Sequence, residues 1–219
     1  MDDKTGCVPG AALNRQPRDF LYWLDLVRVI GAGVVLGAIM GRIIVRRPYH
    51  LERLRPRSWL PGVKRMDLKR WLVLLTISLS VAFLSLVFSL AIGSILQHSG
   101  IETVSPQEYP FVSIERDYPW LALLLVNILP IFEEWIFRGV IMDELIRWRR
   151  SKLLAVLTSA LLFSAFHLSN PGTYPAIVIS MLPASLLLSM CYLYTGLGGA
   201  ILSHNSYNTV LVVIGLLAR

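Results

Sequence analysis

The chain is organised around the stretch Ile128–Val140, which reads ILPIFEEWIFRGV. Two adjacent carboxylates, Glu133 and Glu134, lie in this strongly apolar run, and Arg138 follows the second of them by four residues. In a soluble protein the run would be an ordinary salt-bridged helix, but the sequence around it has the composition of a bilayer-spanning segment. A charged residue at the centre of a membrane helix costs at least about 2.5–3.5 kcal/mol. We therefore expect these three side chains to serve a function.

The composition of the whole chain indicates an integral membrane protein. Of the 219 residues, 55% are hydrophobic and only 16% are charged, whereas a soluble domain has about 25% charged residues. The mean hydropathy is +0.60. These values predict an all-α fold, a polytopic transmembrane helical bundle, located in the cell membrane. The two cysteines, Cys7 and Cys191, match no metal or redox spacing and are assigned no role.

Six apolar segments are long enough to cross roughly 30 Å of hydrocarbon as helices. They cover residues 21–45, 71–96, 119 to the basic cluster at 147–150, 152–168, 174–194 and 200–219. In the expected organisation, residues 1–19 form a polar tail, residues 20–118 hold the first two spans and a basic loop, and residues 119–219 form a helical core.

The net charge is +7, and its distribution predicts the topology. Basic residues crowd segments 46–70 and 147–152, whereas segment 97–118 carries four acidic groups against one arginine. Short basic loops stay in the cytoplasm and lie well against anionic lipid. Both chain termini are therefore expected outside. Because this pattern accounts for the positive charge, no nucleic-acid partner is predicted.

Two features of the first span concern packing. Asp25 and Arg28 are three residues apart, so they share a helix face and can pair. Gly33, Gly37 and Gly41 recur every fourth residue. This spacing predicts a smooth stripe that allows a neighbouring helix to approach closely.

Polar side chains in three spans form a candidate site, which consists of Glu133, Glu134, Arg138, His167, His204 and Asn208. The third and fourth spans form a hairpin around a basic turn. Glu133 lies 17 residues before Arg150, and His167 lies 17 residues after it. At about 1.5 Å per residue both are roughly 25 Å from that turn. The two side chains are therefore expected at the same depth.

The last span contributes His204 and Asn208, which are one helical turn apart and can face the same cleft. Counted from the turn at Gly196, these residues lie only about 12–18 Å deep. A tilt or kink is therefore needed to bring them level with the other site residues.

These residue types suit the hydrolysis of an amide by water. A carboxylate beside a histidine can hold and deprotonate a water molecule, and a histidine with an asparagine can donate to a developing oxyanion. No serine or cysteine has an obvious base partner, so no acyl-enzyme is predicted. Alternatively, Glu133, His167 and His204 could bind a divalent metal such as zinc, which would itself activate the water.

Three motifs occur in order, each within an expected span: EExxxR from Glu133 to Arg138, FxxxH from Phe163 to His167, and HxxxN from His204 to Asn208. Together they resemble the CPBP family of intramembrane proteases, also called the CAAX prenyl endopeptidase or Abi family. Gly139 and the Leu-Gly-Gly-Ala run from Leu197 fit the same pattern. The resemblance covers roughly residues 119–212, which makes segment 119–219 the expected catalytic core.

The resemblance implies a role for each matching residue. Glu133 with His167 would activate the hydrolytic water, Glu134 would support the site and pair with Arg138, and His204 with Asn208 would form the oxyanion hole. Zinc would not be obligatory. Members cleave near the C-terminus of prenylated proteins, or process bacterial peptides and confer immunity to them. The expected partners are therefore membrane lipid and a membrane-associated peptide or protein substrate, prenylated in some members.

Other interpretations stay open from the sequence alone. Glu134 and Arg138 could be a purely structural pair, and the chain could be a membrane immunity or binding protein that keeps the site without the activity. A proton-coupled transporter would use Glu133 and His167 as a relay, although no internal repeat supports it. The topology also matters, because the first two motifs lie nearer the outer face. Either the cleft opens outward to a different substrate or the charge rule misplaces the chain.

Overall fold

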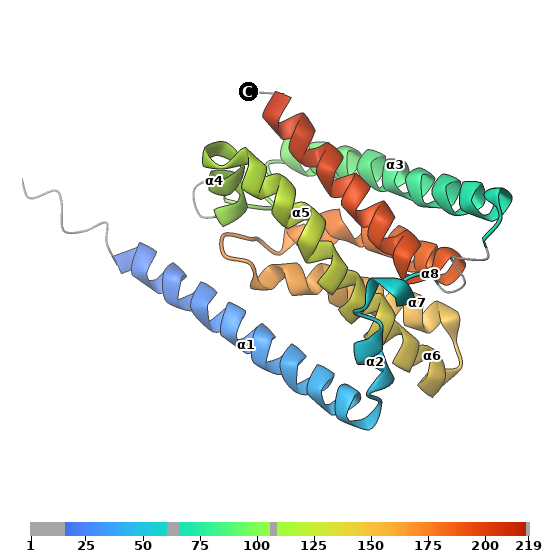
Figure 1. Ribbon diagram of the computed structural model, residues 1–219. Coiled ribbons are helices and arrows are strands. Elements are labelled where there is room, and N and C mark those ends of the chain that lie inside the picture. The colour runs from blue at the N-terminus through green and yellow to red at the C-terminus, as the bar shows by residue number, and fades with distance from the viewer. Residues whose placement is uncertain (1–15, 61–65, 106–108, 218–219) are drawn as a thin grey trace, which may run out of the picture.

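The computed structural model describes residues 16–60, 66–105 and 109–217 (Figure 1). Most of the predicted polar tail, together with Cys7 and part of the basic loop, lies outside these residues. The elements, in order, are α1 (Gln16–Arg46), α2 (Tyr49–Glu52), the 3-10 helix η1 (Pro56–Ser58), α3 (Leu68–His98), α4 (Pro110–Asp117), α5 (Pro119–Glu134), the π-helix η3 (Trp135–Met142), α6 (Asp143–Arg149), α7 (Lys152–Phe166), the 3-10 helix η4 (His167–Ser169) and α8 (Ala176–Leu217). The predicted all-α helical fold is confirmed.

Five continuous helical segments are long and apolar enough to cross a membrane: Trp23–Arg46, Leu68–His98, Pro119–Arg149, Lys152–Ser169 and Ala176–Leu217. The count differs from six because the last two expected spans are joined. In α8 the backbone leaves helical geometry at Gly196, where φ is 73° and ψ is −169°. That left-handed φ suits glycine, which has no Cβ to clash.

The chain reverses direction at this glycine. Leu188 and His204, each eight residues from Gly196, line the same cavity, and so do Ala184 and Asn208, each twelve residues away. Only an antiparallel arrangement of the two halves brings both pairs together. Each half has about 20 residues, enough to cross the hydrocarbon layer. The two halves of α8 therefore correspond to the fifth and sixth expected spans.

The two ends of the bundle differ in charge, as the sequence predicts. At one end the loop after α1 is tied to α6 by ion pairs: Arg47 Nε lies 3.0 Å from Glu144 Oε2, and Arg53 Nη2 lies 2.6 Å from Asp143 Oδ2. The turn between α6 and α7, with its arginines, lies at this end. At the opposite end Val104 pairs with Thr173 in an isolated β-bridge. The positive-inside rule assigns the basic end to the cytoplasm.

Cysteine labelling tests this orientation. In a background lacking Cys7 and Cys191, a cysteine replacing the exposed Ser99 is expected to react with an impermeant thiol reagent added to intact cells. A cysteine replacing the exposed Arg57 is expected to react only after permeabilisation. The physical reason is that the basic loop is retained on the cytoplasmic side. The reverse labelling pattern would overturn the topology.

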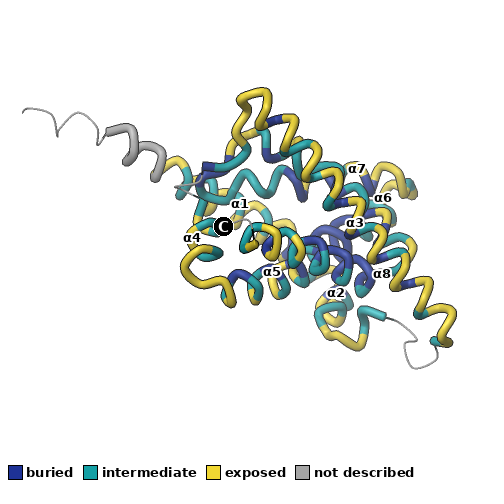
Figure 2. Tube along the Cα trace, turned by 90° about the horizontal axis from the view of Figure 1, so that it is seen from above, coloured by how far each residue is buried: buried dark blue, intermediate teal, exposed yellow. Residues whose placement is uncertain are grey.

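Small side chains allow close helix packing between α3 and α8 rather than along α1. Among the described helices, α3 and α8 share the most extensive contact, and a Cβ added to Gly199 would lie 3.0 Å from Ser78 Oγ. By contrast, a Cβ on Gly33, Gly37 or Gly41 would meet no described atom within 4 Å. Within the described part of the chain, the glycine stripe of the first span therefore has no neighbouring helix packed against it. Figure 2 shows the buried residues concentrated in the middle of the bundle.

Candidate active site

The two glutamates lie at an irregular point of the third span. Pro130 occurs inside α5, where it removes a backbone donor, and from Trp135 to Met142 the helix continues with π geometry. Such π segments are rare and are frequently found at functional sites. Glu133 and Glu134 end the α-helical part just before the wider turn begins. The irregularity was not foreseen, because an apolar run carries no local signal for a π-helix.

Behind the cavity lies a fully buried ion pair between Glu134 and Arg138, both of which have 0% exposed surface. Arg138 Nη1 donates to Glu134 Oε1 at 2.9 Å. The rest of the guanidinium is also occupied: Nη2 donates to Ser185 Oγ at 2.8 Å and Nε to Ser189 Oγ at 3.4 Å. Its carbon lies 4.4 Å from the centre of the Phe163 ring. A buried pair is stable only when its remaining donors are satisfied in this way.

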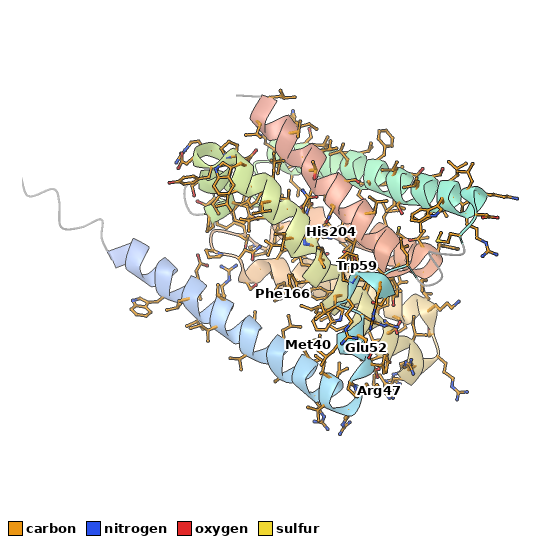
Figure 3. All side chains as sticks on the ribbon, viewed as in Figure 1. Met40, Arg47, Glu52, Trp59, Phe166 and His204 are labelled. Atoms are coloured by element: carbon orange, nitrogen blue, oxygen red, sulfur yellow. The ribbon has the colours of Figure 1, made fainter. Side chains whose placement is uncertain are left out.

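Glu134 also holds a histidine. Its Oε1 atom lies 2.8 Å from His204 Nδ1, and because a carboxylate only accepts, the proton must reside on Nδ1. The opposite ring nitrogen, Nε2, lies 3.7 Å from Glu133 Oε2. His204 thus lies between the two carboxylates, with its orientation fixed by the inner one. Figure 3 shows it in the interior of the bundle, where α8 passes α5.

The outer carboxylate belongs to a cavity of about 300 Å³. Glu133 keeps 26% of its side-chain surface exposed. The polar lining consists of Tyr109, Glu133, His167, Asn170, His204 and Asn208, and the apolar lining of Phe111, Val126, Leu129, Pro130, Phe163, Met181, Ala184, Leu188, Tyr207, Leu211 and Val212. A mostly apolar cavity with a few convergent polar groups is the usual form of a binding site.

His167 begins η4, immediately after α7 ends at Phe166. Its Nδ1 lies 2.9 Å from the carbonyl oxygen of Phe163. Since a carbonyl only accepts, Nδ1 carries the proton, and in the neutral ring Nε2 presents a lone pair. His167 therefore has the tautomer required of a base in the cavity.

The structure brings all six candidate residues together. Four of them line the cavity, namely Glu133, His167, His204 and Asn208, and Glu134 and Arg138 lie directly behind it. Glu133 and His167 line the same cavity, which agrees with their expected equal depth. His204 and Asn208 reach them because the chain reverses at Gly196.

Sequence reasoning missed several contributors. Ser185 and Ser189, one helical turn apart, hold Arg138; two serines at that spacing in an apolar span were the available signal. Tyr109 comes from the loop before α4 and bonds through its side chain to Asn170. Burial, and after it the negative charge of Glu133, raise the pKa of the Tyr109 phenol above its ordinary value. The phenol therefore remains a hydrogen-bond donor at the cavity.

The metal hypothesis requires three ligands converging on one point. Within residues 16–60, 66–105 and 109–217, no group of three or more His, Cys, Asp or Glu is arranged to hold a metal ion. His204 directs Nδ1 to Glu134, and His167 directs Nδ1 to a carbonyl. The expected set of Glu133, His167 and His204 shares the cavity but does not form such a group.

Comparison with known proteins gives one match. Residues 115–210 match the family described as type II CAAX prenyl endopeptidase Rce1-like. The matched segment contains α5, η3, α6, α7 and most of α8, and with them every candidate site residue. A comparison with curated proteins found no match, and a comparison with solved structures found none.

Proposed function

Because residues 115–210 match the type II CAAX prenyl endopeptidase Rce1-like family, we propose that the protein is an intramembrane endopeptidase that hydrolyses a peptide bond with an activated water. One observation carries the proposal. A partly exposed carboxylate, Glu133, shares a small cavity with His167, His204 and Asn208 inside a bundle of apolar helices. The lining of this cavity is mostly apolar, and electrostatic interactions are stronger in such surroundings than in bulk water.

In the proposed reaction Glu133 takes a proton from water, and His167 Nε2 holds that water as a hydrogen-bond acceptor. The hydroxide oxygen bonds to the carbonyl carbon of the substrate, and the carbonyl oxygen becomes an oxyanion. Asn208 donates to this oxyanion through its amide, and His204 donates through Nε2 when both of its ring nitrogens are protonated. The carbon–nitrogen bond then breaks, and Glu133 returns the proton to the leaving amine.

Glu134 and Arg138 hold this arrangement without touching the substrate. Glu134 fixes the ring of His204 through Nδ1, and Arg138 holds Glu134 in place through its hydrogen bond to Oε1. No step passes through a metal, because the residues that the structure describes form no group of three or more His, Cys, Asp or Glu arranged to hold one. Zinc dependence is therefore not part of the proposal.

The site also indicates the kind of substrate. The apolar lining favours apolar side chains on both sides of the scissile bond. Tyr109 and Asn170, on the cavity wall, come from loops at the acidic end of the bundle, which the charge rule places outside the cytoplasm. We infer that a membrane-associated peptide approaches from that side. A prenylated cytoplasmic protein would need the opposite topology, so the cysteine labelling distinguishes the two substrate classes.

Hydrolysis by purified protein tests the proposal. We expect cleavage of at least one member of a panel of membrane-tethered and prenylated peptides. His167→Ala is expected to lower kcat by about 10²–10³-fold, because the water that Glu133 deprotonates is no longer held in place, whereas His98→Ala, at an exposed helix end, leaves kcat unchanged. Activity is expected to survive a zinc chelator. Loss in chelator with recovery on adding zinc would contradict the metal-free mechanism, and binding of peptides without cleavage would favour an immunity or binding protein.

A further inference from the structure

The first span makes few contacts with the rest of the bundle. Only 6% of its apolar window is buried, and Met40 is the one described side chain of α1 that is buried. The helix meets the other elements mainly at η4, near its beginning, and at α2 and η3, near its end. Figure 1 shows α1 along the edge of the bundle. Its contact with η4 is notable because η4 begins with His167.

Two charged side chains of α1 make that contact. Arg28 Nη1 donates to Asp25 Oδ1 at 2.7 Å. The other terminal nitrogen, Nη2, donates to the carbonyl oxygen of Leu168, to Thr173 Oγ1 at 3.1 Å and to the Thr173 carbonyl at 3.0 Å. Asp25 Oδ2 accepts from the Gly172 amide at 3.1 Å. The expected Asp25–Arg28 pair forms, and both partners bind the same loop.

This loop runs from His167 to Thr173 and holds the catalytic histidine of the proposed mechanism. Leu168, which accepts from Arg28, directly follows His167. Thr173 Oγ1 lies 3.1 Å from the His167 carbonyl and 2.8 Å from that of Asn170. Both ends of the loop are therefore fixed to one ion pair on a helix that otherwise packs loosely.

We propose that Asp25 and Arg28 are positioning residues that hold His167 at the cavity, an inference that rests on the proposed function. The α-helix before His167 ends at Phe166, so the position of the ring depends on its bond to the Phe163 carbonyl and on the loop that holds the His167 backbone. A displacement of about 1 Å at a catalytic group can cost about 10²-fold in rate. The cavity walls come mainly from α5 and α8, so substrate binding is expected to change much less than turnover.

Kinetics and hydrogen–deuterium exchange on the full chain in lipid nanodiscs test the role. Arg28→Gln is expected to lower kcat about 10–100-fold with KM within about twofold, and to speed amide exchange in segment 167–174 about tenfold. Asp25→Asn is expected to speed exchange at Gly172. Arg28→Lys keeps the charge but reaches fewer acceptors. Its kcat and its amide exchange rate are expected to lie between those of Arg28→Gln and the wild type. Arg42→Gln, exposed on the same helix, is the matched control.

Each outcome decides the proposal. If amides of segment 167–174 exchange at the wild-type rate in Arg28→Gln, Arg28 does not hold this loop. If they exchange faster but kcat is unchanged, Arg28 holds the loop but does not position His167 for catalysis. If the wild type cleaves no peptide, the proposed function fails separately. In that case the rate at which diethyl pyrocarbonate modifies His167, measured relative to His98, tests whether Arg28 positions His167. A rate that changes severalfold in Arg28→Gln supports the proposal, and an unchanged rate overturns it.

Discussion

Replacing Glu133 with glutamine is expected to lower kcat by about 10³-fold, within the range for removal of a general base. Glutamine has nearly the same shape but cannot accept the proton of the attacking water. Because the side chain is partly exposed and its nearest described ionic partner, His204 Nε2, is 3.7 Å away, the substitution should cost little stability. The loss is therefore expected in kcat at an unchanged unfolding midpoint.

The matched control for this variant is Glu102→Gln, an exposed carboxylate in the loop after α3. It carries the same chemical change at the same end of the bundle and is expected to retain wild-type turnover. The wild type and the two variants are compared by their initial rates on the best peptide of the panel. Thermal unfolding of the same preparations shows whether their stability differs. A Glu133→Gln protein that keeps more than about a tenth of the activity would remove Glu133 from the role of base.

Breaking the buried pair behind the cavity is expected to have the largest effect on stability. Glu134→Gln leaves a guanidinium with 0% exposure next to a neutral amide, and Arg138→Met leaves an equally buried carboxylate. Removing one partner of a buried pair typically costs about 3–5 kcal/mol, because the remaining charge has no compensation. Glu134→Gln also weakens the hold on His204 Nδ1, so activity should fall in the protein that still folds.

The double variant Glu134→Gln with Arg138→Met combines the two single substitutions and shows whether the two charges depend on each other. Without either charge, much of the stability lost in the single variants is expected to return. The exposed pair Arg116–Asp117, with side-chain exposures of 65% and 48%, supplies the control, since Arg116→Met should cost less than about 1 kcal/mol. Denaturant unfolding in detergent measures all four proteins. Purely additive single effects would show that the two charges do not depend on each other.

Much of the fold follows from the sequence because the bilayer leaves few choices. An apolar run of sufficient length must form a helix to satisfy its backbone, and the rise per residue is then fixed. For this reason the equal distances of Glu133 and His167 from the basic turn predicted that the two would lie at the same depth, and both line the same cavity. The basic loops likewise gather at one end of the bundle.

The sequence was less informative about how the helices face one another. The glycine stripe of the first span has the spacing of a packing seam, yet no described side chain lies against it, and the close packing occurs at Gly199 instead. The spacing of small residues shows which face of a helix they share. It does not show which other helix packs against that face, because this depends on contacts between segments distant in the sequence. For the same reason the sequence did not predict that Asp25 and Arg28 bind the loop after α7.

The sequence by itself determined the membrane-spanning helices, the charge difference between the two ends and the six polar residues that meet at the site. The Glu134–Arg138 pair was expected from its spacing, and only the tertiary structure decided the other partners: Glu134 also contacts His204, and two serines donate to or accept from the same buried cluster around Arg138. The reversal at Gly196 and the π-helix after Glu134 were also decided at that level. The physical reason is that helix formation depends on local hydrogen bonds and hydrophobicity, whereas partner choice depends on which helices pack together.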